Sequence, residues 1–293
     1  MRFVVFSAEH VRTALRTSWQ CGPGDCVPLT EHLWRVDVGE ESLIAKRVPL
    51  ARRARFEAGL RAAECLEADG IAAGEPVRAA DGALTVPVEG GALALVTRVP
   101  GRPLHPDDPI DQQWWGDTLA NVHRALRRFT DPALAAFPQV REEAPHLALE
   151  PWLRPAIRGA AAAVRRLLVT DQLTYGVLHG EPSPEEFRLD PATGRVGLVD
   201  WDRAGTGPLV YDLAAAVLFA GGTERGADVV DGYVSAGLVG GDECAAALPI
   251  MLVFRAAIKA DRLAARLSRP GGSEAGRAAD RDALRSLADV LQG

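Results

Sequence analysis

Several acidic residues lie close together in the second half of the chain, around two short apolar runs. The segment VLHGEPSPEEFRLDP contains His179, Glu181 and Glu186, and the next apolar run ends in Asp200 and Asp202. Carboxylates are ligands that Mg²⁺ prefers, and a positioned carboxylate also serves as a general base. Together, these side chains could bind a divalent metal ion and accept a proton.

A lysine in the first half of the chain is the second candidate for chemistry. Of the 33 Lys and Arg residues, only Lys46 and Lys259 are lysines. Because a compact ammonium and a planar guanidinium are not interchangeable, a lysine in so arginine-rich a chain indicates ammonium chemistry. Lys46 lies in the alternating apolar segment SLIAKRV, which is typical of a β-strand.

The first hundred residues predict a small antiparallel sheet that carries one helix. HLWRVDV and SLIAKRV are joined by GEE and predict a β-hairpin, and GALTVPV and ALALVTRV around EGG predict a second. Between them, ARRARFEAGLRAAECLEADG keeps Phe56 and Leu60 at helical spacing, and Gly70 ends the helix. A short helix capped by Ser7 precedes the sheet.

The remainder of the chain predicts helices, after the Pro-rich segment PGRPLHPDDP. The exception is a pair of short strands around the turn PATG, within the acidic region. We therefore predict an α+β fold with a β-rich domain at residues 1–100 and a helical domain at 101–293. A cleft between two such domains is a favoured ligand site.

The composition excludes several classes of partner. A net charge of −6 and a pI near 5.6 predict no binding of nucleic acid or of an anionic membrane surface. No apolar run approaches the roughly 20 residues needed to span a bilayer. The start MRFVVFSAEH is too short for a signal peptide, so a cytoplasmic location is expected. The four cysteines lack zinc-site spacing and are expected to be free thiols.

In order along the chain, LIAKR, HGEPSPEE and LVDWDRAGTGPLVYDLA resemble motifs of the aminoglycoside phosphotransferase and choline kinase family. That family is a branch of the protein-kinase-like fold, with the motifs H-G-D-x-x-x-x-N, I-D-W-[ED] and G-x-x-x-x-D-L-A. LANVHRAL is similar to the family's helix before the loop, and ALVTRVPGRPL to its hinge. The resemblance covers roughly residues 27 to 266. It implies a bilobal fold with a small antiparallel sheet lobe carrying one helix and a larger, mostly helical lobe.

The resemblance also implies a site for ATP or GTP with Mg²⁺ between the lobes. Lys46 would hold the α- and β-phosphates and be oriented by Glu57, or by Glu64 one heptad further along the same helix. The nucleotide base would be bound by backbone groups of Thr97, Arg98 and Val99.

For the acidic region, the resemblance implies Asp200 as a magnesium ligand. His179 would fix the loop by hydrogen bonding, and Asp202 would face either the substrate or solvent. Asp212 would cap the helix that it precedes or tether the loop, and capping is the reading we adopt.

Two positions depart from the family's pattern. Glu181 stands where the family has its aspartate base, and one more methylene extends the carboxylate by about 1.5 Å. A misplacement of about 1 Å costs on the order of 10²-fold in rate, although Pro182 and Pro184 favour a different backbone path for this loop. Glu186 replaces the metal-binding asparagine and adds a negative charge, with Glu185 as the alternative in a register shifted by one residue.

Two functions from different classes therefore remain open. The first is an ATP-dependent O-phosphotransferase that acts on a hydroxyl of a small molecule or peptide, with Glu181 as base. The second is a pseudokinase, a binding or scaffold protein in a natural-product pathway whose cleft holds a protein or peptide partner. Four acidic residues of the second domain would either contact a cationic aminoglycoside or form an ordinary solvated surface: Asp228, Asp231, Asp242 and Glu243.

Overall fold

The structure is a computed structural model, and it describes residues 6–170, 172–271 and 273–292. Its contacts divide the chain into two compact units that are each assembled from separate segments. The first unit comprises Met1–His105, Thr118–Ala135 and His179–Gly205, and the second contains Pro106–Asp117, Ala136–Leu178 and Thr206–Gly293. The acidic region therefore belongs to the same unit as Lys46. The division of the sequence at residue 100 stays a prediction.

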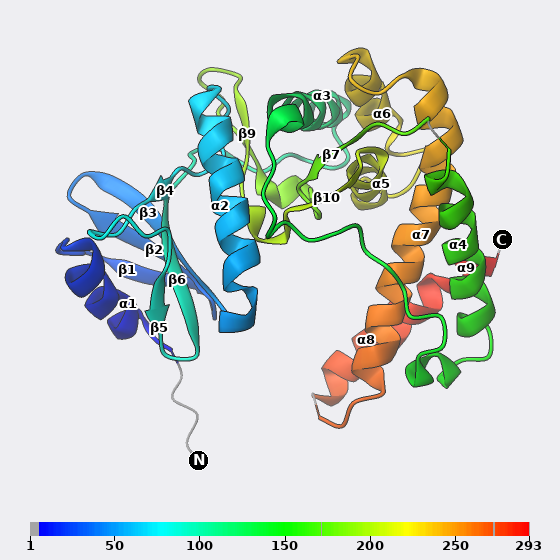
Figure 1. The fold of residues 1–293 in the computed structure, drawn as a ribbon, viewed down its shortest axis with the longest axis horizontal. Coiled ribbons are helices and arrows are strands. Elements are labelled where there is room, and N and C mark those ends of the chain that lie inside the picture. Colours follow the sequence, from blue (N-terminus) through cyan, green and yellow to red (C-terminus); the bar gives the residue numbers. More distant parts are fainter. Residues whose placement is uncertain (1–5, 171, 272, 293) are drawn as a thin grey trace. The chain divides into compact units, whose positions relative to one another are not determined.

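An antiparallel sheet forms the centre of the first unit (Figure 1). Its strands are β1 (Cys26–Thr30), β2 (Leu33–Val38), β3 (Glu41–Val48), β4 (Pro76–Val77), β5 (Val86–Val88) and β6 (Gly91–Thr97). Neighbouring strands follow the order β1-β2-β3-β6-β4, and β5 also pairs with β6. Both hairpins predicted from the alternating segments are confirmed, as β2–β3 and β5–β6.

The two faces of this sheet bury different apolar side chains, as the period of two along a strand requires. One face packs Trp34, Val36 and Leu43 against α1 (Ala8–Ala14), whose N-cap is Ser7 as predicted. The other face packs residues of β3 and β6 against Phe56 and Leu60 of α2 (Arg53–Ala68). Helix α2 is the predicted helix, and it ends just before Gly70, which has a positive φ of 79°.

A second, small hairpin completes the first unit and carries the acidic region. Strands β8 (Phe187–Leu189) and β9 (Val196–Leu198) pair around the predicted PATG turn. The hairpin is tied to the preceding segments by backbone hydrogen bonds, Leu198 N–H to Ala72 C=O (2.9 Å) and Leu189 N–H to Arg102 C=O (2.8 Å). These bonds fix the position of β9 and therefore the position of Asp200, which follows the strand closely.

The second unit is mostly helical. Its elements are α4 (Leu153–Leu168), β7 (Tyr175–Leu178), α5 (Val210–Phe219), α6 (Ala227–Ser235), α7 (Gly241–Leu267), α8 (Glu274–Ser286) and α9 (Ala288–Gln292). Helix α3 (Pro109–Ala125) and strand β10 (Gly205–Pro208) each have residues in both units. Helices α4 and α5 pack along α7, where Ile157 and Leu153 contribute to two apolar clusters. The sheet and these helices confirm the α+β prediction.

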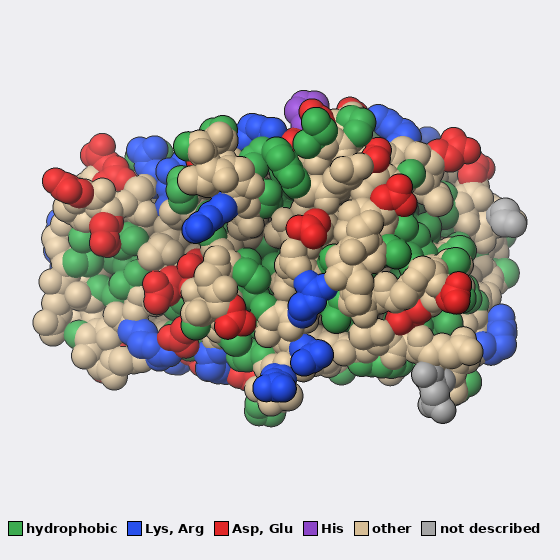
Figure 2. All heavy atoms as spheres, turned by 90° about the horizontal axis from the view of Figure 1, so that it is seen from above, with side chains coloured by type: hydrophobic (Ala, Val, Ile, Leu, Met, Phe, Trp, Pro, Cys, Tyr) green, Lys and Arg blue, Asp and Glu red, His purple; other side chains and the backbone are tan. Residues whose placement is uncertain are grey.

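Figure 2 shows acidic and basic side chains interspersed over the face in view. None of the helices in the described part of the chain combines the length and the apolar character that crossing a bilayer demands. The four cysteines are free thiols, as expected.

Candidate active site

Lys46 lies in the middle of the sheet, near the C-terminal end of β3. It pairs with Leu33 of β2 on one side and with Ala94 of β6 on the other. Because Ala45 is fully buried on the α1 face, Lys46 points to the opposite face, where its side chain is 16% exposed. The ammonium is thus carried by a central strand whose position is fixed on both edges.

The ammonium of Lys46 contacts two carboxylates from the end of the β8–β9 hairpin. It forms an ion pair with Asp200, and its Nζ lies 3.0 Å from Oδ2 of Asp202. Burial by itself lowers the pKa of Lys46, but the two carboxylates outweigh burial and raise that pKa above its ordinary value. The predicted phosphate-binding lysine and the predicted metal ligand are therefore brought together.

Asp200 holds a backbone conformation that few residues other than glycine adopt. Its φ is 69° and its ψ is 65°, in the left-handed region. A single 3₁₀ turn, Trp201–Arg203, follows, and the indole N–H of Trp201 donates to the carbonyl of Leu198 (2.9 Å). This sharp turn directs Asp200 and Asp202 to the same ammonium. Uncommon backbone geometry of this kind occurs preferentially at functional sites.

His179 lies at the start of the acidic loop and is 1% exposed. Its Nε2 is 2.9 Å from the carbonyl oxygen of Val199, the residue before Asp200. The imidazole also packs edge-on against the ring of Trp201, with a centroid distance of 4.8 Å. The histidine thus links the acidic loop to the turn that carries Asp200.

Glu181, the predicted base, forms an ion pair with Arg203. The glutamate side chain is 38% exposed, so it is accessible to a ligand. Gly180 has a φ of 93°, and a Cβ at this position would lie 2.4 Å from the carbonyl oxygen of Arg203. Only glycine permits this close approach, which brings residue 181 next to Arg203.

Glu186 is largely buried, and its backbone joins the loop to the end of β9. Its N–H donates to Ser183 C=O (3.0 Å), and its carbonyl accepts from Val199 N–H (2.9 Å). Burial of the side chain, together with the negative charge of Asp200, raises the pKa of Glu186 to about 7. Glu185, the alternative in the shifted register, is exposed. The structure therefore places Glu186, and not Glu185, in the electrostatic field of Asp200.

The raised pKa of Glu186 predicts a pH-dependent stability. Between the ordinary pKa of 4.5 and about 7, the folded protein holds a proton that the unfolded chain has lost, so stability falls as pH rises through this window. Replacing Glu186 by glutamine removes the titrating group and should therefore remove this loss of stability at higher pH. We expect the unfolding free energy of Glu186→Gln, relative to the unmodified protein, to increase by about 2–3 kcal/mol between pH 5 and pH 8.

Urea denaturation at the two pH values measures this difference. Glu185→Gln is the matched control, because it removes an exposed carboxylate from the adjacent position. A gain that is the same at pH 5 and pH 8, or that equals the gain of the control, contradicts the assignment.

Neither of the two predicted partners on α2, Glu57 and Glu64, forms an ion pair with Lys46. Glu57 accepts hydrogen bonds from Arg53 (2.9 Å) and from the hydroxyl of Thr85, and Glu64 is bound by Arg78 (2.7 Å). Burial raises the pKa of Glu57, but the hydrogen bonds from Thr85 and Arg53 outweigh burial and lower it. The structure therefore pairs Lys46 with carboxylates after β9, and the orienting role of Glu57 stays a prediction.

The predicted base-binding segment follows β6. The amide of Thr97 donates to Glu75 C=O (2.8 Å), and the amide of Arg98 donates to Ser42 C=O (3.2 Å). Among the described residues, the amide of Val99 makes no backbone hydrogen bond of this kind. The side chain of Val99 lies against Gly197 of β9, where a Cβ would be 3.2 Å from it. The amides of Thr97 and Arg98 are therefore engaged within the protein, and the base-binding role of the segment stays a prediction.

Asp212 does not cap helix α5, so the capping prediction is wrong. The helix begins at Val210, and its N-cap is Leu209, without a side-chain capping bond. Asp212 is consequently the third helical residue, and it is fully buried. It raises the pKa of the buried Tyr233 hydroxyl, although burial of that hydroxyl is the larger cause. The helix starts earlier than expected because the chain turns directly after Pro208.

The acidic residues that we considered as contacts for a cationic substrate differ in their surroundings. Glu243 accepts from both the amide and the hydroxyl of Thr174 (2.6 and 2.7 Å), which ties α7 to the start of β7. Asp228 accepts a long hydrogen bond from Gln113 (3.4 Å). Asp231 and Asp242 are on α6 and α7. The contacts of Glu243 indicate a structural role within the second unit.

The donor set near Lys46 fits a magnesium ion that is bound together with phosphate. Asp200 and Glu186 are both carboxylates, and they are close enough for the charge of one to raise the pKa of the other. Within residues 6–170, 172–271 and 273–292, no group of three or more His, Cys, Asp or Glu side chains is arranged to hold an ion. Since Mg²⁺ is usually bound by one or two carboxylates plus substrate phosphates, the set matches this mode.

Two arginines at the site were missed by sequence reasoning. Arg203 pairs with Glu181, and Arg55 donates hydrogen bonds to the carbonyls of Arg203 and Ala204. Arg203 directly follows the candidate residue Asp202 in the sequence, and this adjacency could have identified Arg203 as a site residue. No comparable signal exists for Arg55, because its contacts depend on how α2 packs.

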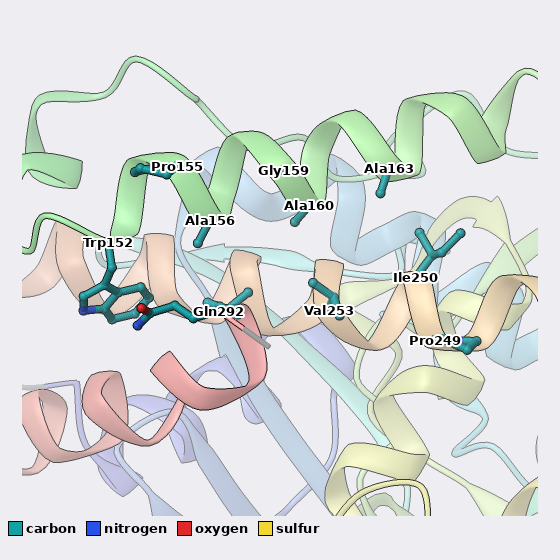
Figure 3. A pocket seen from close by; sticks show the side chains of 11 residues that line it. Trp152, Pro155, Ala156, Gly159, Ala160, Ala163, Pro249, Ile250, Val253 and Gln292 are labelled. Atoms are coloured by element: carbon teal, nitrogen blue, oxygen red, sulfur yellow. The ribbon is translucent and has the colours of Figure 1, made fainter.

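A groove within the second unit has a different character (Figure 3). Its volume is about 680 Å³, and its walls are α4 and α7, with Trp152 and Gln292 at one end. The wall residues are small or apolar: Pro155, Ala156, Gly159, Ala160, Ala163, Pro249, Ile250 and Val253. Because the lining includes no acid and no base, this groove lacks the groups that phosphoryl transfer requires.

Comparison with protein families gives one match. Residues 30–248 match the model of the family described as the phosphotransferase enzyme family. The matched range includes Lys46, the acidic loop, Asp200 and Asp212. No significantly similar sequence was found among curated proteins.

Solved structures with the same fold were found over nearly the whole chain. A microcompartment-associated aminopropanol kinase has a TM-score of 0.77 at 20% identity, covering 98% of this chain and 97% of that chain. Amicoumacin kinase in complex with AMP-PNP and Ca²⁺ has a TM-score of 0.71 at 18% identity, with coverages of 96% and 93%. A choline kinase from Streptococcus pneumoniae has a TM-score of 0.65 at 13% identity, with coverages of 96% and 98%. These similarities confirm the predicted kinase-like fold.

Proposed function

Because this chain belongs to the phosphotransferase enzyme family, we propose that it transfers a phosphoryl group from ATP or GTP to a hydroxyl group. The acceptor is a small molecule or a peptide. The observation that carries the proposal is the contact of Lys46 with Asp200 and Asp202, since it joins a cation and two carboxylates that are 154 or more positions apart in sequence. Phosphoryl transfer depends chiefly on such positioned charges.

The residues of the site have complementary roles in this reaction. Lys46 neutralises the phosphates, and backbone groups at Thr97–Val99 bind the nucleotide base. Glu181 accepts the proton of the acceptor hydroxyl while the oxygen forms a bond to the γ-phosphorus and the bond to the leaving diphosphate breaks. Arg203 holds the Glu181 carboxylate, which compensates for the added methylene.

Asp200 and Glu186 are the residues that would hold Mg²⁺. When bound, the ion supplies neutralisation of the negative charge that the nucleotide phosphates carry. With Asp200 holding the ion, the ammonium of Lys46 would bind phosphate oxygens. Glu186 would bind the ion as a carboxylate, and without the ion burial raises its pKa to about 7.

A second candidate function is that of a pseudokinase that binds a partner without phosphoryl transfer. The observation that favours it is the engagement of Glu57 with Arg53 and Thr85, which leaves Lys46 without a carboxylate partner from α2. In protein kinases, the corresponding lysine–glutamate pair must be in place for activity. In this reading the chain is a scaffold for a protein or peptide of a natural-product pathway.

A transfer assay distinguishes the two functions. The full chain is incubated with γ-labelled ATP or GTP, Mg²⁺ and a panel of hydroxyl compounds that includes aminopropanol, choline, an aminoglycoside and a serine-containing peptide. We expect label to appear on at least one acceptor and to be lost in the variant Glu181→Gln. Binding of nucleotide without transfer to any acceptor, and without hydrolysis, supports the pseudokinase instead.

A further inference from the structure

Helix α2 packs directly on the turn that follows Asp200. A Cβ added to Gly59 would lie 2.0 Å from the carbonyl oxygen of Trp201, so only glycine allows the helix to approach this closely. Gly59 is one of the buried residues of the helix. A glycine in a helix interior costs about 0.5–1 kcal/mol relative to alanine, so its presence here indicates that the close packing is important.

Arg55 reinforces this contact from the same side of the helix. Residues 55 and 59 are one helical turn apart and therefore lie on one face. The Nε of Arg55 donates to the carbonyl of Ala204 (3.1 Å), and its Nη2 donates to the carbonyl of Arg203. Both carbonyls belong to the residues that immediately follow Asp202. Hydrogen bonds from a charged donor are stronger than those between neutral groups.

Other contacts of α2 fix the helix in the position from which it packs on the turn after Asp200. Arg53 hydrogen-bonds to Thr85 before β5, and Arg61 forms an ion pair with Asp131 (Nε to Oδ2, 2.6 Å). The helix is thus anchored on both sides of Arg55. Its N-terminal half is tied to the sheet side through Glu57 and Thr85, and not to Lys46.

We infer that Arg55 is a positioning residue for the metal-binding carboxylate, acting through the backbone of the turn after Asp200. By holding the carbonyls of residues 203 and 204, Arg55 keeps Asp200 in its left-handed conformation and keeps Asp202 beside Lys46. The inference rests on the proposed function, because it concerns metal and nucleotide at the same site. In this inference, helix α2 orients Asp200 and does not orient Lys46.

Isothermal titration of ATP, first with Mg²⁺ and then with EDTA, tests this role. For each variant, the ratio of the two affinities measures the metal-dependent part of binding, which a general loss of folded protein does not alter. We expect Arg55→Met to reduce this ratio on the order of tenfold, the usual size of an effect transmitted to a metal ligand by its neighbours. Arg55→Lys, which retains one donor group and the charge, should give an intermediate ratio and serves if the methionine variant does not fold.

Arg52→Met is the matched control, because Arg52 is exposed and immediately precedes the same helix. The control should retain the ratio of the unmodified protein. If the unmodified protein shows a metal-dependent gain and Arg55→Met retains it as fully as the control does, the positioning role is overturned while the proposed function stands. If the unmodified protein shows no metal-dependent gain, both the proposed function and this inference are wrong.

Discussion

Replacing Asp200 by asparagine is expected to lower the rate of phosphoryl transfer by about 10²-fold or more. The substitution keeps the size of the side chain but removes the carboxylate that pairs with Lys46 and that would bind Mg²⁺. A metal ion contributes several kcal/mol of charge stabilisation in such reactions, and about 2.7 kcal/mol corresponds to a factor of 10². Asparagine also tolerates the left-handed backbone, so the loss does not arise from strain.

The measurement is the initial rate of acceptor phosphorylation at saturating Mg²⁺ and nucleotide. Asp25→Asn, a change at an exposed aspartate before β1, is the control for loss of a negative charge in the same unit. Equal rates for Asp200→Asn and the control exclude Asp200 as the metal ligand.

The second large effect is expected at Glu181. If this carboxylate is the general base, Glu181→Gln should lower the rate by about 10²–10⁴-fold while leaving the affinity for nucleotide unchanged. Glu181→Asp should retain part of the activity. The carboxylate is kept, but the shorter side chain holds it further from Arg203. Arg203→Met, which frees the carboxylate, should likewise lower the rate and spare nucleotide affinity.

These variants are compared by their rates and by nucleotide binding measured separately. Glu185→Gln removes an exposed acid from the same loop and should be close to the unmodified protein in both measurements. A rate for Glu181→Gln within a factor of about two of that control indicates that no base at residue 181 is needed.

Much of this site is specified by local sequence. Alternation in β3 places Lys46 on one face of a strand, and the two apolar runs around PATG form the hairpin that ends at Asp200. Both patterns depend on neighbours within a few residues, and so both were predictable. The fold class followed from the same local signals, taken in order along the chain.

The partner of Glu57 was not predictable, because it depends on packing between distant segments. Glu57 and Glu64 are at plausible helical positions, but the approach of Gly59 to the carbonyl of Trp201 orients α2 so that Glu57 faces Thr85. The start of α5 is a similar case. Which residue becomes the N-cap is decided by the chain turning after Pro208, and Asp212 consequently lies inside the helix.

In the proposed function, Lys46, Asp200 and Glu186 bind nucleotide and divalent metal together. The most direct measurement is the thermal unfolding midpoint of the unmodified protein with ATP and Mg²⁺, compared with ATP and EDTA. We expect a clear rise with Mg²⁺ and little change with EDTA, because a ligand at about 100 times its Kd stabilises the folded state by about 2.7 kcal/mol. Equal midpoints in the two conditions, with GTP as well as with ATP, would contradict the account.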